Sequence, residues 1–570
     1  MTNALLQTDA YKLGHVFQYP DKTELVYSNF TARSGKHSGV MGSKGVYFIG
    51  LQYFIKEYLI KEWNVSFFYK PKEVVVNRYK RFVSKMLNSD IDVSHIEKLH
   101  DLGYLPLTIK ALEEGSFVPY KIPMLTIVNN SPEFYWLTNY IETVLSCELW
   151  LPITSATTYM NFKKNSLMYS EATCDDNSFV PFQNHDFSMR GMQNRQAAAL
   201  SGFASLACGS FGTDTLPAIE LAEEYYNADI DLELIGCSVP ALEHSTTTAG
   251  GEDNELETLR RIITKVNPTG IVSYVSDTWD FWKLVTEYLQ ELKPEIMSRD
   301  GKLVIRPDSG DPVEIICGKE SRIIEINSDY DFELAKKRIC EQVECEVADE
   351  TPHGERGEDE KTVVFKWDNK HFRATVEIEW NRYDKQYYYT DGNNLLNIEE
   401  IHLTKSPQEK GLIECLWEIF GGTVNSKGYK VLDSHIGAIY GDSITLGRQK
   451  EILDRLKNKG FASSNIVFGV GSYTYGMVSR DAHAMAMKST YVKIDGVGKP
   501  IFKDPKTDDG TKKSAKGLLM VTQAGRDFTL SDNVTHIEES NGALQVVFKD
   551  GKLIKETSLA EIRKVVDSSL

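Results

Sequence analysis

The segment GKLVIRPDSGDP at 301–312 is a short apolar run that ends in an arginine, a proline and an aspartate. Similar runs, each ending in small or acidic residues, occur at 231–238 (DLELIGCS), 270–280 (GIVSYVSDTWD), 438–443 (AIYGDS) and 466–472 (IVFGVGS). Segments with helical character lie at 154–172, 194–209 and 215–227. Short apolar strands that alternate with helices predict a parallel α/β barrel or sheet.

In a parallel α/β barrel the loops after the carboxyl ends of the strands carry the chemistry. In this chain those positions hold small, hydroxyl-bearing or acidic side chains. We therefore expect five strand ends to converge on one mouth, which would be formed by Ser238, Asp277, Asp308, Gly441 with Asp442, and the loop from Gly469 to Ser472.

The two ends of the chain differ from this central region. Residues 1–150 mix helical segments with strand-like ones, and residues 485–570 return to strands and turns. Residues 316–410 are highly charged and rich in tyrosine, with alternating strand patterns that indicate an inserted subdomain. We predict an irregular barrel over 151–484, interrupted by that insertion, and a β-rich α+β domain built from both termini.

Composition excludes several classes of protein. The 570 residues are 41% hydrophobic, carry a formal net charge of −17, and contain no apolar run long enough for a membrane span. The start of the sequence does not resemble a secretory signal, so we expect a cytoplasmic protein with reduced cysteines. The acidic charge disfavours nucleic acid as a partner, whereas a local cluster of bases can still bind small anions.

Three stretches supply candidate site residues: 185–191 (HDFSMRG), 238–245 (SVPALEHS) and 304–312 (VIRPDSGDP). Together they offer an aromatic ring, arginines, a histidine and carboxylates, which suit a flat heterocycle beside a phosphorylated sugar. Phe187 is either a core residue or a platform for stacking, with Arg190 as a nearby cation. His244 is either structural, a general base or a nucleophile.

The carboxylates also have two interpretations each. Asp214 precedes an apolar helix and is either a turn or N-cap residue or a ligand-binding group. Asp277 and Asp308 are either loop caps or groups that bind a metal, bind ribose hydroxyls, or stabilise positive charge.

The loop FGVGSYTYG at 468–476 lacks the spacing of a dinucleotide-binding fingerprint but suits a phosphate held by backbone N–H groups. The basic residues that follow the loop form either a solvated face or anion-binding groups; they are Arg480, Lys488, Lys503, Lys512 and Lys513.

Taken together, these stretches resemble the nicotinamide phosphoribosyltransferase family of type II phosphoribosyltransferases. The resemblance runs through QTDAYKLGH (7–15), YFIGLQY (47–53), YWLTNYIET (135–143), HDFSMRG, GTDT (212–215), SVPALEHS, VSD (275–277) and IRPDSG (305–310), and resumes at NSKGYKVL (425–432), GDSI (441–444), SRDA (479–482) and IFKDP (501–505). It implies joining of nicotinamide to phosphoribosyl pyrophosphate, which gives nicotinamide mononucleotide and pyrophosphate in NAD salvage.

The resemblance also implies a nicotinamide pocket shared between two subunits of a head-to-tail homodimer. Phe187 would stack on one face of the pyridine ring and Tyr11 of the partner subunit on the other. Asp214 would accept a hydrogen bond from the carboxamide and disfavour nicotinate, since two like charges would meet there. Ser238 and Arg306 would contact the amide oxygen or the ribose side.

The remaining roles concern the sugar, the phosphates and the cofactors. Asp308 and Asp277 resemble the acids near the ribosyl centre and Mg²⁺, and His244 resembles a histidine that is phosphorylated during optional ATP hydrolysis, with Glu243 orienting its ring. Gly441 and Asp442 would face the ribose hydroxyls. Gly471 and Ser472 would face the 5′-phosphate. The expected phosphate and pyrophosphate ligands, from either subunit, are Arg190, Arg33, Arg480, Lys488, Lys503 and Lys512.

Two departures and three alternatives stay open. The insertion at 316–410 has no counterpart in the typical family member, and Ser472 stands where a glycine is usual, which restricts the backbone. The alternatives are a nicotinate phosphoribosyltransferase, a barrel enzyme of metal-assisted hydrolysis or aldol chemistry, and a catalytically silent sensor of NAD metabolites.

Overall fold

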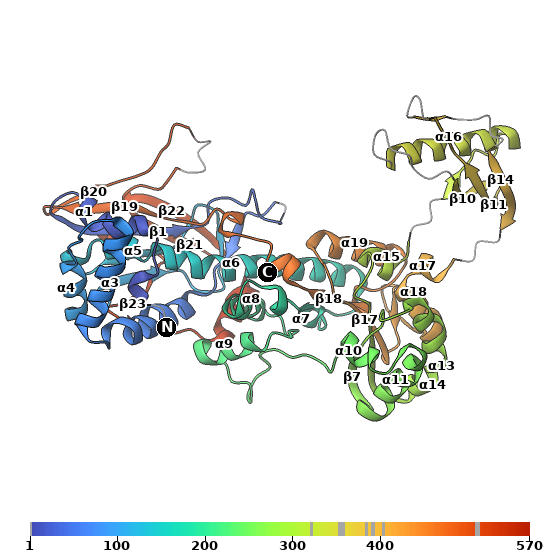
Figure 1. Cartoon of the computed structure of the whole chain (residues 1–570), viewed down its shortest axis with the longest axis horizontal. Helices are drawn as coiled ribbons and strands as arrows, with labels where there is room; N and C mark the ends of the chain where they lie inside the picture. Colours follow the sequence, from blue (N-terminus) through green and yellow to red (C-terminus); the bar gives the residue numbers. More distant parts are fainter. Residues whose placement is uncertain are drawn as a thin grey trace. The chain divides into compact units, whose positions relative to one another are not determined.

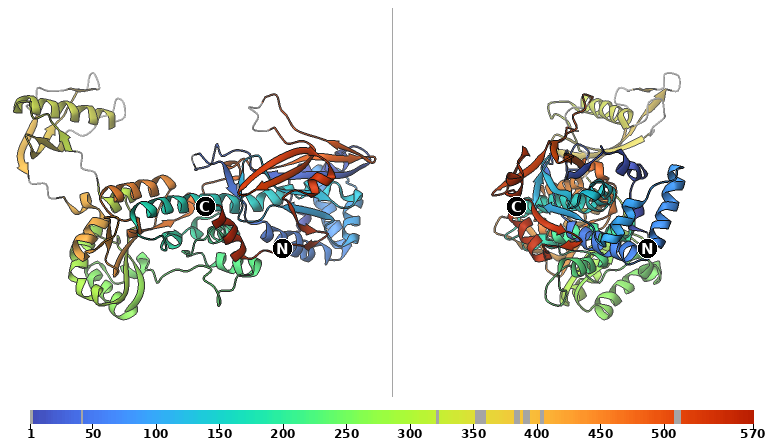
Figure 2. Two further views of the ribbon diagram at one scale, coloured as in Figure 1. Left: turned by 180° about the vertical axis from the view of Figure 1, so that it is seen from behind. Right: turned by 90° about the vertical axis from the view of Figure 1, so that its left-hand side faces the viewer.

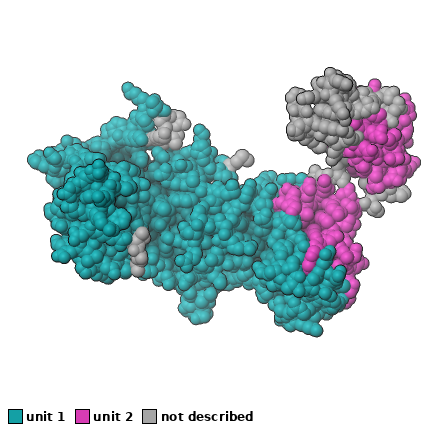
Figure 3. All heavy atoms as spheres, viewed as in Figure 1, with its two compact units in different colours: residues 1–278, 295–309, 422–570 teal, residues 279–294, 310–421 magenta. Residues whose placement is uncertain are grey.

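The computed structural model describes residues 3–40, 42–319, 323–350, 360–381, 386–388, 394–401, 405–507 and 513–570. The chain divides into two compact units (Figure 3). Unit 1 comprises residues 1–278, 295–309 and 422–570, and unit 2 comprises residues 279–294 and 310–421. Every candidate site residue that the structure describes belongs to unit 1.

One sheet of unit 1 joins the two ends of the sequence. Its seven antiparallel strands have the order β20-β19-β1-β5-β3-β23-β24. The N-terminal region supplies β1 (Thr23–Thr31), β3 (Leu107–Ala111) and β5 (Pro123–Asn129), and the C-terminal region supplies β19 (Ala486–Ile494), β20 (Val497–Pro500), β23 (Gln545–Lys549) and β24 (Lys552–Leu553). The prediction of one β-rich fold built from both termini is therefore confirmed.

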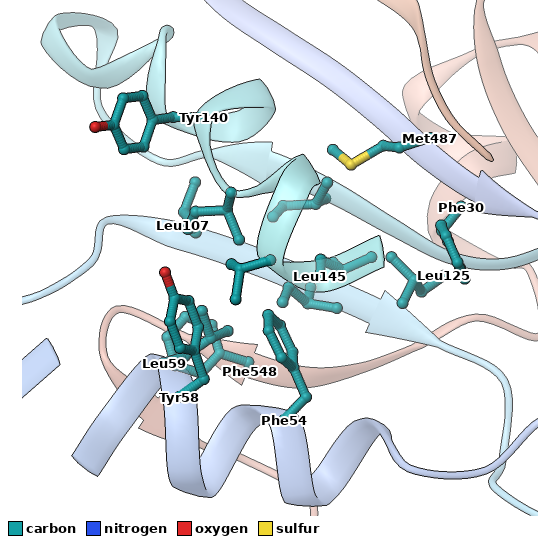
Figure 4. Packing of buried hydrophobic residues seen from close by; sticks show 14 of the residues in the cluster. Phe30, Phe54, Tyr58, Leu59, Leu107, Leu125, Tyr140, Leu145, Met487 and Phe548 are labelled. Atoms are coloured by element: carbon teal, nitrogen blue, oxygen red, sulfur yellow. The ribbon is translucent and has the colours of Figure 1, made fainter. Parts of the chain in front are cut away.

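A hydrophobic core holds this sheet against the helices that follow β2 (Gly45–Tyr47). Leu107 and Leu125 of the sheet face Phe54 of the helical segment 51–68 and Leu145 of α6 (Glu142–Thr173), and Phe548 of β23 lies beside Tyr58 (Figure 4). Each fully buried large apolar side chain contributes about 1.5–3 kcal/mol. This packing fixes β1 and β19, which carry Arg33 and Lys488 at or near their ends.

The second sheet of unit 1 is parallel, with the order β6-β18-β17-β8-β7. Its strands are β6 (Asn184–Asp186), β18 (Ile466–Val470), β17 (Ile436–Tyr440), β8 (Asp300–Arg306) and β7 (Thr269–Val275). Among the described residues, only single parallel bridges continue it beyond the two edges, at Asp186↔Thr213, Gly212↔Cys237 and Ala241↔Ser273. The predicted parallel α/β barrel is thus present in irregular form, as half a barrel continued by bridges.

One expected strand is not formed. Of residues 231–238 only Cys237 makes a bridge, because the chain turns at Asp229, whose carboxylate accepts from the N–H of Asp231 and whose carbonyl accepts from Leu232. Aspartate favours such local turns over strand pairing. Leu232, which a buried strand would cover, is 84% exposed.

A single long helix, α6, connects the regions of the two sheets (Figure 1, and from behind in Figure 2). It spans 32 residues and continues through Pro152, since side chains on both sides of the proline are buried. The expected domain boundary at 150 falls inside this helix. The helix α8 (Arg195–Ala207) packs on α6, and α9 (Leu216–Tyr226) and α22 (Leu559–Ser568) pack on α8.

Unit 2 has a core of its own. Four strands in the order β14-β11-β10-β9 accompany α16 (Phe332–Glu350). These strands are β9 (Ile323–Glu325), β10 (Glu360–Trp367), β11 (Lys370–Glu377) and β14 (Leu395–Ile401). Ile339 and Val343 of α16 are buried in one cluster with Phe365 and Val376. The boundaries of the 316–410 insertion and of the other domains stay predictions.

In the described part of the chain no helix combines the length and apolarity needed to cross a membrane. All eight cysteines are unpaired, in agreement with the expectation of reduced thiols.

Candidate active site at the ends of the parallel strands

Each of the five parallel strands ends next to a candidate residue. Phe187 follows β6, Gly471 follows β18, Gly441 follows β17, Asp308 lies two residues after β8, and Asp277 lies two residues after β7. Because the strands are parallel, these ends share one edge of the sheet. Sequence reasoning placed Asp277, Asp308, Gly441 and Gly471 at strand ends, whereas β6 replaces the expected strand before Ser238.

Asp277 and Asp308 lie against each other at the ends of neighbouring strands. Asp277 Oδ2 accepts hydrogen bonds from the backbone N–H groups of Asp308 at 2.9 Å and Ser309 at 2.7 Å. Its other oxygen, Oδ1, is buried and has no hydrogen-bond partner among the described residues. Burial raises the pKa of Asp308, while the nearby Arg306 opposes that rise and Asp277 adds to it.

His244 is the first residue of α10 (His244–Thr248), and its side chain is 48% exposed. Its Nδ1 lies 3.1 Å from Thr278 Oγ1, and its Nε2 lies 3.8 Å from Asp277 Oδ1. The Glu243 carboxylate instead accepts a hydrogen bond from Ser245 Oγ. The expectation that Glu243 orients the ring is therefore wrong, because Glu243 is engaged by Ser245 and Thr278 contacts the imidazole.

Phe187 lies against two glycines at the sheet edge. Its N–H donates to the carbonyl of Val470 at 3.0 Å, which continues the pairing of β6 with β18. A Cβ added at Gly469 would overlap the Phe187 ring, and one added at Gly441 would lie 3.6 Å from Phe187 Cε2. The ring is only half-buried, so its position suits a platform better than a core residue.

Asp214 does not cap a helix. The N-cap of α9 is Thr215, and no side chain caps that helix. Asp214 Oδ1 accepts instead from His185 Nε2 at 2.9 Å and from Ser238 Oγ at 2.5 Å. Burial alone would raise the pKa of Asp214, but these two hydrogen bonds and the charges of His185 and Arg306 outweigh burial and lower it.

Arg306 lies between the carboxylates of Asp214 and Asp308 and influences both electrostatically. Its guanidinium donates to the carbonyl of Leu242, and its Nε is buried without a hydrogen-bond partner among the described residues. Its side chain is 13% exposed. A buried guanidinium with a spare donor favours an additional acceptor, such as a ligand oxygen.

The glycine-containing loop meets the segment that carries Arg190. Gly471 is the N-cap of the short helix α20 (Ser472–Tyr475), and a Cβ added at Gly191 would overlap Ser472 Oγ. Arg190 is exposed in the one-turn helix η6 (Met189–Gly191). The segment that carries Arg190 therefore lies against the loop, and the exposed Asp442 follows β17 at the same edge.

The other basic candidates form a second group, near the antiparallel sheet. Lys488 lies on β19, and burial lowers its pKa; nearby Glu142 opposes that change, and Arg33, Lys503 and Lys12 add to it. Tyr11, whose side chain is 61% exposed, has its ring 5.2 Å from Lys12 Nζ. Arg480 begins η11 (Arg480–Ala482), and its carbonyl accepts from Met485 N–H. Lys512 lies outside the described residues.

The distance between the two groups of candidate residues follows from their anchor points on α6. Glu142, its first residue, forms an ion pair with Lys12 beside Tyr11, and Ser166 accepts from Asn184, three residues before Phe187. These anchors are 24 residues apart, which corresponds to roughly 36 Å along a helix. Three strand residues span only about 10 Å. Tyr11 and Phe187 of one chain therefore do not meet on one ring.

His185 is the site residue that sequence reasoning missed. It belongs to the stretch HDFSMRG and lies two residues before Phe187, where strand periodicity places both side chains on one face. Its ring centroid is 4.8 Å from that of Phe187.

Comparison with known proteins identifies the class to which this fold and site belong. Residues 182–552 match the nicotinate phosphoribosyltransferase (NAPRTase) family, and residues 3–109 match the nicotinamide phosphoribosyltransferase N-terminal domain. The chain belongs to the nicotinate phosphoribosyltransferase family, which confirms the family resemblance seen in the sequence.

Individual relatives narrow the comparison. The chain is 42% identical to the nicotinamide phosphoribosyltransferase of Acinetobacter baylyi over 99% of this chain and 96% of that protein. It is 30% identical to the protein of the same name from Mycoplasma genitalium, over 90% of this chain and 94% of the other. The crystal structure of nicotinate-nucleotide pyrophosphorylase from Pyrococcus furiosus matches with a TM-score of 0.51 at 13% identity, covering 100% of this chain and 98% of that one. This last likeness concerns the fold alone.

Proposed function

We propose that this protein transfers the phosphoribosyl group of 5-phosphoribosyl 1-pyrophosphate to nicotinamide, giving nicotinamide mononucleotide and pyrophosphate in NAD salvage. The observation that carries the proposal is the Asp214 carboxylate, which has a lowered pKa and is held by His185, whose ring lies against Phe187. An ionised carboxylate accepts a hydrogen bond from a carboxamide and repels the carboxylate of nicotinate. The names of the relatives support the same base.

The residues at the strand ends suit each part of this reaction. Phe187 would stack on the pyridine ring, and Arg306 and Ser238 would contact the amide oxygen or the ribose side. Displacement at the anomeric carbon passes through an oxocarbenium-like state, which the fixed carboxylates of Asp308 and Asp277 would stabilise. Gly441 and Asp442 would face the ribose hydroxyls. The 5′-phosphate would be contacted by Arg190, Gly471 and Ser472.

Mg²⁺ is part of the proposal, with Asp277 and Asp308 as the residues near it. No group of three or more metal-binding side chains exists in the described part of the chain. A few carboxylates nevertheless suit this ion, since Mg²⁺ is commonly held by one or two carboxylates together with substrate phosphates, and Asp277 Oδ1 is an acceptor without a donor. Bound there, Mg²⁺ would neutralise charge on the pyrophosphate.

A head-to-tail homodimer with shared sites is the second part of the proposal. Tyr11 is exposed, and Lys488 lies near Glu142 at the start of α6, whereas Phe187 lies three residues after Asn184, which bonds to Ser166 near the other end of the helix. A partner subunit would bring its own Tyr11, Arg33, Arg480, Lys488, Lys503 and Lys512 to the barrel edge. Those cations would supply the positive charge that a pyrophosphate requires.

ATP is proposed as an optional second substrate, with His244 as the phosphoryl acceptor. The ring is half-exposed, and its Nδ1 is held by Thr278. That contact leaves Nε2 as the nitrogen available to a γ-phosphate. The cytoplasmic location likewise stays a prediction.

The decisive experiment measures product formation from phosphoribosyl pyrophosphate and Mg²⁺ with nicotinamide or nicotinate, for the wild type and Asp214→Asn, with and without ATP. We expect wild-type turnover of nicotinamide alone and reduced selectivity in the variant. Preference for nicotinate would establish the nicotinate enzyme, and absence of turnover with either base would favour the silent sensor. An increase in turnover or product yield on addition of ATP would support the phosphohistidine proposal.

A further inference from the structure

One side chain touches two of the residues that the proposed function assigns to the nicotinamide base, Asp214 and Phe187. His185, on β6, lies 2.9 Å through its Nε2 from Asp214 Oδ1. The centroid of its ring lies 4.8 Å from that of Phe187, at an interplanar angle of 59°. The side chain is 12% exposed. His185 therefore links the carboxylate proposed for the amide to the ring proposed for the pyridine.

Gly212 leaves the space that this histidine occupies. A Cβ at position 212 would lie 2.7 Å from His185 Nδ1 and 3.1 Å from its Cγ. Gly212 also pairs with the sheet on both sides, since its carbonyl accepts from Asp186 N–H and it bridges to Cys237. The imidazole is thus packed between the backbone of Gly212 and the ring of Phe187, without room for a larger neighbour.

The contact fixes which oxygen of Asp214 is available. An ionised carboxylate only accepts hydrogen bonds, so His185 Nε2 carries the proton that is donated. Oδ1 receives this bond and the one from Ser238 Oγ, whereas no described residue donates to Oδ2. The Asp214 side chain is 42% exposed. Two donors therefore hold one oxygen and leave the other for a ligand.

We propose that His185 is a positioning residue for base selectivity: it fixes Asp214 and Phe187 together so that Asp214 Oδ2 faces the carboxamide. This inference rests on the proposed function. Without the His185 bond the carboxylate turns about its side-chain torsions and loses a charge-assisted partner. Such bonds contribute about 1.5–3 kcal/mol, which corresponds to roughly a 10- to 100-fold change in binding.

The test compares His185→Ala, His185→Gln and Gly212→Ala with the wild type. For each, kcat and KM are measured for nicotinamide, for nicotinate and for phosphoribosyl pyrophosphate. We expect His185→Ala to raise the KM for nicotinamide roughly 10- to 100-fold and to reduce the preference over nicotinate by a similar factor. His185→Gln, whose amide also donates, should retain most of the preference, and Gly212→Ala should resemble His185→Ala by displacing the ring.

A matched control exists at the opposite end of the sheet. His435 lies directly before β17, and its Nδ1 is 2.6 Å from Asp433 Oδ1. His435→Ala removes a similar histidine–aspartate contact and should leave the preference for nicotinamide unchanged.

The outcomes separate this inference from the proposed function. A wild type that does not turn over nicotinamide refutes the function. A wild type that prefers nicotinamide, with a His185→Ala variant of unchanged KM and preference, refutes the positioning role. A purely structural role predicts equal effects on both bases and on phosphoribosyl pyrophosphate, and no rescue by His185→Gln. If His185→Ala does not fold, the test relies on His185→Gln and Gly212→Ala. A preference for nicotinamide over nicotinate that equals the wild-type value in both variants would contradict the proposal.

Discussion

The edge of the parallel sheet and the face of the antiparallel sheet carry different kinds of candidate side chain. The parallel edge carries the aromatic ring and the acids, Phe187, Asp214, Asp277 and Asp308, together with Arg306 between the acids. The antiparallel side carries Tyr11 and most of the candidate cations, gathered around Lys488. Neither region alone has the composition that a base, a ribose and a pyrophosphate together require.

The two regions also hold their side chains in different ways. At the parallel edge the candidates follow strand ends, where backbone N–H groups fix them, as Asp308 and Ser309 do for Asp277. On the antiparallel side Lys488 lies within β19, opposite Asn29 of β1. The pairing of the strands fixes the backbone at Lys488, and thereby the position from which its charged side chain extends. The candidates at the strand ends and the candidates on the antiparallel sheet thus lie toward opposite ends of one long helix.

The largest expected effect comes from the parallel edge. Replacing Asp308 with asparagine removes a fixed charge near the proposed ribosyl centre and should reduce kcat roughly 100- to 1,000-fold. The kcat of the variant is measured from the steady-state formation of nicotinamide mononucleotide. Asp300→Asn, at the opposite end of β8, is the control and should leave kcat unchanged. A loss below tenfold in Asp308→Asn would contradict the assigned role.

The next effect tests whether the two halves come from different subunits. Lys488→Ala should reduce kcat/KM for phosphoribosyl pyrophosphate roughly 10- to 100-fold, because a charge-assisted contact is lost. A purified mixed dimer of Lys488→Ala with Asp308→Asn should recover about half of the wild-type activity, since one of its two sites combines intact halves.

A second mixed dimer, of Asp308→Asn with Asp277→Asn, is the control for this recovery. Both substitutions lie on the parallel edge, so neither site is intact and activity should stay low. Equal behaviour of the two mixed dimers would show that the halves act within one chain.

The third effect is a loss of stability in acid, which we expect to arise from two buried histidines in the antiparallel region. Burial lowers the pKa of both His95 and His483 to about 4. Both are neutral in the folded state at neutral pH, so the unfolded chain binds protons first as the pH falls below about 6.5. Stability should therefore fall between about pH 6.5 and 4, by about 2 kcal/mol per histidine at pH 5.

Denaturant unfolding at pH 7 and pH 5 measures this loss. His483→Gln removes one titrating group and should reduce the difference between the two pH values by about half of the combined histidine effect. His435→Gln alters an imidazole that lies partly exposed beside Asp433, at the parallel sheet, and serves as the control. An unchanged difference in His483→Gln would show that acid lability arises elsewhere.

The sequence predicted the strands β7, β8, β17 and β18 because each is an apolar run that a small or acidic residue terminates. The positions of Asp277 and Asp308 after strand ends follow from the same local pattern. The expected strand at 231–238 failed because the Asp229 turn competes with pairing, and α6 passes Pro152 because burial outweighs the local preference for a break.

Long-range contacts account for what the sequence did not predict at the site. The choice between an N-cap and a ligand-binding carboxylate at Asp214 depends on His185 and Ser238, which lie 29 and 24 residues away in sequence. Thr278, 34 residues from His244, contacts the ring in place of the neighbouring Glu243. The separation of Tyr11 from Phe187 becomes visible only when α6 is seen to be one continuous helix.

The smallest effect is expected from replacing Arg563 in the C-terminal helix α22, which contacts the segment before Ser238. Arg563 of α22 donates to the carbonyls of Leu206, Leu234 and Ile235, and its guanidinium lies 4.9 Å from the centre of the Phe211 ring. Leu234 and Ile235 precede Ser238, and Phe211 accepts from Cys237 N–H. Arg563→Ala should therefore loosen the segment that carries Ser238 without touching a substrate.

We expect Arg563→Ala to lower the free energy of unfolding by about 1–3 kcal/mol, because three carbonyls, two of them partly buried, lose a charged donor. The KM for nicotinamide should rise by a few-fold with kcat little changed, since Ser238 is displaced while Asp277 and Asp308 are not. Lys564→Ala, on the exposed face of the same helix, should change neither quantity. A change in kcat of Arg563→Ala with KM unaltered would place the helix in communication with the ribosyl acids, and the base pocket would then not depend on it.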